Sequence, residues 1–130
     1  MSTTWKPENY NSVSVYIVAD NAQQLIDFVK KTFEAADLRR FDLRDGKIMH
    51  AEVRIDDTVV MIADAGGTYP AFPVWLHVYV PDAQATHKKA LAAGGVSVQE
   101  PIHKPGDPDL RGGVKDPSGN TWWVSTQLAT

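Results

Sequence analysis

The sequence predicts an α+β fold of two tandem βαβββ modules, which form a curved mixed sheet around a concave cavity with the helices outside. An internal repeat is the first observation behind this prediction: aligning Asp20 with Asp82 places SVSVYIVAD over VWLHVYVPD. With one residue of slack, DTVVMIAD then falls over GNTWWVST. The second observation is the length of 130 residues, which suits one domain, with modules at residues 12–64 and 73–127.

The first module is expected to begin with a β-branched strand at residues 12–18. Asp20 follows as a helix N-cap, and apolar residues then recur at helical spacing, at Ala22, Leu25, Ile26, Val29 and Phe33. Three strands are predicted next, at residues 38–43, 47–55 and 58–63. The turns Asp45-Gly46 and Asp56-Asp57 separate them.

A Gly- and Pro-rich linker, DAGGTYPAFP, leads to the second module. A strand is predicted at residues 74–80, and Asp82 then caps a helix that Gly94-Gly95 ends at Ala93. Three further strands are expected at residues 96–100, 110–115 and 121–126, the last two joined by the turn DPSG. Both modules therefore have the same order of elements.

Composition excludes several classes of protein. A net charge of -3 does not favour nucleic acid as a partner, since that requires a basic face. The absence of cysteine excludes disulfides and thiolate chemistry. No apolar stretch is long enough to span a membrane, and MSTTWKPENYN lacks the pattern of a signal peptide. A cytoplasmic location is the resulting expectation.

The repeat, the segment VYIVADNAQQLIDFVKKTF, the hairpin DGKIMHAEVRIDDTVVMIAD and the closing DPSGNTWWV together resemble the vicinal oxygen chelate superfamily. That group contains glyoxalases, extradiol dioxygenases and bleomycin-resistance proteins. KIMHAEVRIDDTVVMIAD is similar to glyoxalase-like proteins of the PhnB type. The resemblance covers residues 13–126 and implies the fold more firmly than the activity, because this fold supports many chemistries.

The resemblance also implies where a metal would bind, since the family's metal enzymes take one ligand from the first and one from the last strand of each module. These positions fall near Val13, Met61, Trp75 and Trp123. Valine and tryptophan offer no ligand atom, and a thioether is too soft for the ions such sites use. Shifting the register by one residue restores no site. We therefore expect neither a metal nor another cofactor.

Alternation along the strands predicts which side chains line the cavity. Trp75, His77 and Tyr79 are expected there, with Thr121, Trp123 and Ser125 beside them. The first module would add Val59, Met61 and Ala63 from its last strand, and Val13, Val15 and Ile17 from its first. Its Ser14 and Tyr16 would lie beneath the helix, like Val74, Leu76, Val78, Val80, Trp122 and Val124 in the second module.

Histidines give the remaining candidates. His50 alternates with Glu52 and Arg54 on one strand face, opposite Met49, Ala51, Val53 and Ile55. The pair His50 and Glu52 could be half of a metal site if His77 or His103 joined them, but a hydrogen-bonded strand face is the simpler interpretation. His87 is expected on the surface, His103 in a loop over the cavity, and Arg111 beside an anionic ligand or solvent. The predicted ligand-binding set is Trp75, His77, Tyr79, Met61, Trp123, His50 and Arg111.

Two functions follow. The first is a binding protein that sequesters a planar or amphipathic molecule, such as an aromatic antibiotic, in an aromatic cavity without metal. The resemblance implies a homodimer, and the sequence leaves open whether the modules close on themselves or pair between chains. The second is a metal-dependent or metal-free lyase or isomerase. The absent ligand quartet favours binding over catalysis.

Overall fold

The structure is a computed structural model that describes residues 5–128. Its elements follow the predicted order, and β6 alone runs clearly beyond its expected end, through Pro101 to His103. The elements are β1 (Val15–Ala19), α1 (Ala22–Phe33), β2 (Ala36–Asp42), β3 (Ile48–Ile55), β4 (Thr58–Asp64), β5 (Trp75–Tyr79), α2 (Ala83–Ala92), β6 (Val96–His103), β7 (Asp109–Lys115) and β8 (Thr121–Gln127). The predicted pair of βαβββ modules is confirmed.

Each module builds its own mixed sheet, in the order β1-β4-β3-β2 and β5-β8-β7-β6. The first strand of each module pairs parallel with the last, and the other pairs are antiparallel. One helix covers one face of each sheet, and we call the other face the open face. The first open face belongs to β1–β4 and the second to β5–β8.

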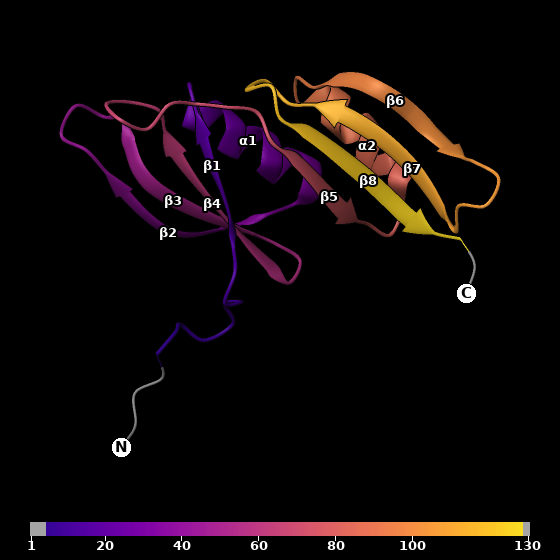
Figure 1. Ribbon diagram of the computed structural model, residues 1–130, viewed down its shortest axis with the longest axis horizontal. Coiled ribbons are helices and arrows are strands. Elements are labelled where there is room, and N and C mark those ends of the chain that lie inside the picture. Colours follow the sequence, from indigo (N-terminus) through magenta and orange to yellow (C-terminus); the bar gives the residue numbers. More distant parts are fainter. Residues whose placement is uncertain (1–4, 129–130) are drawn as a thin grey trace.

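The helices lie between the two sheets, where the sequence suggested that they would lie outside. α1 and α2 form the main contact between the modules, and Figure 1 shows α1 between the strands of the first module and β5. Phe28 and Val29 of α1 share a buried cluster with Ala90 of α2, and the Phe33 ring lies 5.1 Å from that of Trp122. α1 is buried on more than one side, because Phe28 adds to the predicted apolar stripe. An outside position would expose that second side.

In the structure, β1 and α1 match β5 and α2 with an offset of 61 residues along the chain, whereas the sequence alignment of Asp20 with Asp82 used an offset of 62. The N-cap of α1 is Asn21, whose side chain accepts from the backbone N–H of Gln24, and the equivalent cap of α2 is Asp82. A slip of one residue turns every side chain of a strand to the other face. The prediction for β1 was therefore wrong.

Ile17 is 1% exposed in the core and Val15 packs against it, while Tyr16 lies on the first open face. A second prediction that needs correction concerns the start of β3. A bulge there, opposite Phe41 and Asp42 of β2, changes which face the first residues of β3 present. It leaves Ile48 in the core and Met49 exposed, although Met49 was expected to share a face with Ala51. The predicted core side of β5 and β8 agrees with the structure, since Leu76, Val78 and Trp122 pack in the cluster.

Candidate functional site

Two tryptophans form an aromatic platform on the second open face. The Trp75 ring meets that of Trp123 edge to face, with 5.4 Å between the centroids. Trp75 is 76% exposed, whereas Trp123 is half-buried. An exposed indole on a sheet face leaves a large apolar surface uncovered, and such surfaces mark contact sites.

Gly113 of β7 lets Trp123 lie across the sheet. The two residues are paired in the β7–β8 register, and a Cβ built on Gly113 would come within 2.6 Å of the Trp123 ring. Only glycine permits this approach. The Trp123 Nε1 atom is buried and has no hydrogen-bond partner among the described residues. The ring is thus held by shape rather than by a polar contact.

His77 lies beside the platform. Its Nε2 atom is 2.9 Å from the Ser125 hydroxyl oxygen, and its ring meets that of Tyr79 at 4.8 Å. Burial lowers the pKa of His77, and the positive charge of Arg111 lowers it further. The imidazole is therefore expected to be neutral near pH 7, able to accept or donate a hydrogen bond.

Arg111 already has two carboxylate partners. It forms ion pairs with Asp107 and, at 3.0 Å, with Asp109, which also accepts a 2.7 Å hydrogen bond from the Tyr79 hydroxyl. The hydrogen bond to Asp109 raises the pKa of Tyr79. The second open face therefore has a polar, hydrogen-bonded end next to its aromatic platform. Arg111 is better placed to hold this end in position than to attract a free anion.

The other two predicted site residues, His50 and Met61, lie on the first open face. Met61 is paired with Tyr16 on one side and with Glu52 on the other. No interaction in the described part of the chain joins this group to the tryptophan platform. One chain thus presents the predicted site in two separate parts.

Glu52 is the centre of the first open face, and it is only 2% exposed. Its carboxylate accepts hydrogen bonds from the Tyr10 hydroxyl at 2.5 Å, from Arg39 at 3.2 and 3.3 Å, and from His50 at 2.8 Å. Burial favours the neutral carboxyl, but these three groups outweigh it and lower the pKa of Glu52 to about 2. Tyr10 and Tyr16 were missed in the sequence, Tyr10 because nothing local marks it and Tyr16 because of the register slip.

The structure also tests the proposed metal positions. With the corrected offset, the residue equivalent to Trp75 is Ser14 rather than Val13, so the quartet becomes Ser14, Met61, Trp75 and Trp123. Within residues 5–128, no group of three or more His, Cys, Asp or Glu side chains is placed to hold a metal ion. His50 and Glu52 already form hydrogen bonds with each other and with neighbouring side chains.

The remaining histidines lie elsewhere. His87 was expected on the surface, but it is 2% exposed and its Nε2 atom lies 3.0 Å from the Ser97 hydroxyl oxygen. It lies on the side of α2 that packs against the sheet, and it therefore faces β6. His103 ends β6, and its Nε2 atom lies 2.8 Å from the carbonyl oxygen of Asp107. Neither reaches the tryptophans.

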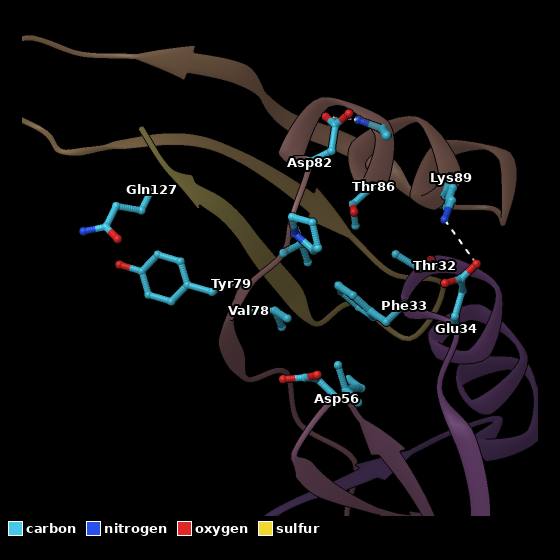
Figure 2. Close-up of a pocket in the computed structure, with 14 residues that line it drawn as sticks. Thr32, Phe33, Glu34, Asp56, Val78, Tyr79, Asp82, Thr86, Lys89 and Gln127 are labelled. Carbon is cyan, nitrogen blue, oxygen red and sulfur yellow. Dashed lines mark hydrogen bonds and ion pairs between the residues drawn. The ribbon is translucent and has the colours of Figure 1, made fainter. Parts of the chain in front are cut away.

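A groove of about 950 Å³ runs between the modules at the end of α1 and the start of α2. Figure 2 shows Phe33 and Val78 inside it, with the ion pair of Lys89 and Glu34 at one end and Tyr79 at the other. Asp56 and Asp82 add carboxylates to its rim. The groove combines apolar side chains such as Phe33 and Val78 with charged ones, and neither Trp75 nor Trp123 lines it.

Two helix-backed βαβββ modules with open sheet faces define the α+β class to which this chain belongs. The chain belongs to the Glyoxalase/Bleomycin resistance protein/Dioxygenase superfamily, whose family model matches residues 11–124. An uncharacterized protein of Mycobacterium bovis, Mb0911c, is 34% identical over 126 residues, covering 85% of this chain and 80% of its own length.

Solved structures with the same fold include TioX from Micromonospora sp. ML1, with a TM-score of 0.76, 22% identity and coverage of 91% of this chain and 99% of TioX. TnmS3, an antibiotic binding protein from Streptomyces sp. CB03234, superposes with a TM-score of 0.69 at 18% identity, covering 92% of this chain and 100% of TnmS3. At these identities the likeness shows the fold alone. In the described part of the chain, no helix is long and apolar enough to cross a membrane.

Proposed function

We propose that the chain binds a planar or amphipathic small molecule, such as an aromatic antibiotic, against Trp75 and Trp123, without a metal. The exposed Trp75 ring, set edge to face on Trp123, is the observation that carries this proposal. A planar ligand would stack on the free face of Trp75, and a stacked ring contributes about 1 kcal/mol beyond its area burial. The antibiotic binding protein TnmS3, which has this fold, supports the same ligand class.

His77, Tyr79 and Arg111 would orient the ligand. His77 can exchange a hydrogen bond with it, and the Tyr79–Asp109–Arg111 network fixes the polar end of the platform. Met61 and His50 lie on the first open face and cannot reach the same ligand within one chain. We propose that a second copy brings them opposite the platform, so that each groove of a homodimer is built from both chains.

Tryptophan fluorescence tests the binding proposal with a panel of planar aromatic antibiotics. We expect quenching by at least one compound in the wild-type chain and its loss in Trp75→Ala, since most of the Trp75 side chain is exposed and its removal leaves the core intact. Trp5→Ala is the matched control, because Trp5 is 83% exposed and lies outside both modules. Quenching that survives in Trp75→Ala, or no quenching by any compound, would contradict the proposal.

His77 supports a second candidate, a metal-free isomerase or lyase. A neutral imidazole beside a hydroxyl can act as a general base, and burial keeps His77 in that form. Exchange of carbonyl-adjacent protons of small 2-oxo compounds with D2O, followed by NMR, would reveal such activity, and His77→Gln should abolish it. Stoichiometric metal in the purified protein would instead favour a metal-dependent enzyme.

A further inference from the structure

The first open face contains a hydrogen-bonded chain, of which the binding proposal uses only His50. The Tyr16 hydroxyl lies 3.0 Å from Nδ1 of His50, and Nε2 of His50 lies 2.8 Å from Glu52. A hydroxyl, an imidazole and a buried carboxylate thus follow one another in line. The same order of groups lets a carboxylate orient a histidine that accepts a proton from a hydroxyl.

The ionised carboxylate fixes the tautomer of the imidazole. A carboxylate with a pKa of about 2 is an acceptor only, so Nε2 of His50 must donate to Glu52. In neutral His50 the lone pair then lies on Nδ1 and accepts the proton of Tyr16. The outer lone pairs of the Tyr16 oxygen remain, so the chain offers a hydrogen-bond acceptor to a ligand.

The charges around His50 favour an anion beside it once it is protonated. Arg39 on β2 balances the charge of Glu52, and the Tyr10 ring lies beneath Arg39 at 5.1 Å. With His50 neutral, the group of Tyr10, Tyr16, Arg39, His50 and Glu52 has no net charge. A proton added to His50 would leave one positive charge, which a bound anion would balance.

An apolar pocket lies next to Tyr16. Its volume is about 710 Å³, and Tyr16 forms part of its wall. The other apolar walls are Val18, Leu43, Ile48, Met49, Ala63, Ala65 and Tyr69. Tyr16 and Tyr69 are exposed, and Lys47, Asp45 and Asp64 also line the pocket. The Asp64 carboxylate already accepts hydrogen bonds from two backbone N–H groups. An aromatic ring could enter with its polar group toward Tyr16 or the lysine. Pockets with apolar walls and a few polar groups are typical of small-molecule sites.

We propose that this pocket binds an aromatic molecule with an acidic hydroxyl, a phenol or an enol, and moves its proton to His50 through Tyr16. The ligand O–H bond breaks as a new O–H bond forms on Tyr16. The original Tyr16 O–H bond breaks as an N–H bond forms at Nδ1 of His50. The products are a phenolate or enolate and an imidazolium paired with Glu52, and no oxidant or reductant takes part.

4-Nitrophenol is a suitable probe, because its phenolate absorbs visible light and its phenol does not. Titrated with protein at a pH below its own pKa, it should show at least a tenfold higher ratio of phenolate to phenol than it shows in buffer. 4-Nitroanisole has nearly the same shape without the proton, and equilibrium dialysis of both compounds measures their binding independently. In Tyr16→Phe and His50→Gln the ratio of phenolate to phenol should fall back to its value in buffer, with circular dichroism confirming that both variants are folded.

The outcomes separate this inference from the proposed function. Leu91→Ala should retain the phenolate band, because Leu91 lies on α2, away from both open faces. Binding of both compounds without a phenolate band would overturn the proton uptake, and so would an equal band in His50→Gln. Failure of both compounds to bind would overturn the site itself, while the tryptophan platform would still be judged by its own quenching experiment.

Discussion

The two tryptophans of the platform make different contributions, although they lie side by side. Trp75 stands free on the surface, while Trp123 rests on the backbone of Gly113. The exposed ring can be removed at little cost in stability, and the half-buried ring cannot. Binding and folding can therefore be separated at Trp75, and the shape of the platform can be tested at Gly113.

Gly113→Ala should disturb the platform although both tryptophans remain in the sequence. The new Cβ would lie 2.6 Å from the Trp123 ring, so the ring must move, at a cost of about 1–3 kcal/mol in the free energy of unfolding. We expect a smaller near-ultraviolet dichroism signal from the tryptophan pair and weaker quenching by the ligand. Gly66→Ala is the matched control, because the only atom near its added Cβ is Lys47 Nζ at 3.7 Å. An unchanged dichroism signal in Gly113→Ala would contradict this account.

Glu52 should stabilise the fold in a pH-dependent way. Its pKa falls from 4.5 to about 2 on folding, so the ionised group contributes about 3 kcal/mol at neutral pH. Because the folded-state pKa is the lower one, this contribution is complete above pH 4.5 and is lost as the pH falls toward 2.

Urea unfolding of Glu52→Gln measures that contribution. The variant should be less stable than wild type by about 3 kcal/mol at pH 7, with the difference shrinking between pH 4.5 and 2. Glu8→Gln should match wild type throughout, since Glu8 is exposed. A difference that stays constant as the pH falls would show that packing, rather than charge, makes Glu52 important.

At the scale of the elements, the helix caps decide which face each first strand presents. Asn21 accepts from the N–H of Gln24 at 3.2 Å, and Asp82 accepts from the N–H of Ala85 at 3.0 Å. Both caps stand directly before the first helical residue. Asp20, the cap predicted from the sequence, is exposed.

Alanine substitution distinguishes the two candidate caps. Asn21→Ala should lower the free energy of unfolding by about 1 kcal/mol, the usual cost of losing an N-cap side chain. Asp20→Ala should change it by less than about 0.5 kcal/mol, as for an ordinary surface position. Thermal unfolding of both variants measures the difference, and the reverse order of effects would restore the predicted cap.

Element order was predictable from the sequence because the strands alternate clearly and both helices have caps and stops. The second open face was predictable for the same reason, with Trp75, His77, Tyr79 and Trp123 where alternation placed them. The first open face was not, since Asp20 and Asn21 are both good caps and a choice between them flips β1. The contact of Tyr10 with Glu52 joins residues 42 apart, which no local pattern reveals.

The whole chain exposes more surface than its mass requires. Its accessible surface is 8078 Å², whereas a compact monomer of 14.3 kDa should expose about 6,800 Å². Exposed apolar side chains contribute to this surface, both in the segment before β1, with Trp5 and Val13, and on the second open face, with Trp75, Tyr79 and Ile102. A standard interface buries about 800 Å² on each partner, so the excess is large enough for a dimer contact.

Ile102→Asp should therefore convert a dimer into a monomer. Ile102 is 47% exposed on the second open face, opposite Arg111 in the register, and a carboxylate there would be buried by a second copy. Light scattering after gel filtration should give twice the chain mass for the wild type and the single mass for the variant. Leu91→Asp is the matched control, because Leu91 is 38% exposed on α2, away from both open faces, and should leave the dimer intact. A monomeric wild type would contradict the proposed two-chain groove, and the first open face would then have to bind its ligand without the tryptophan platform.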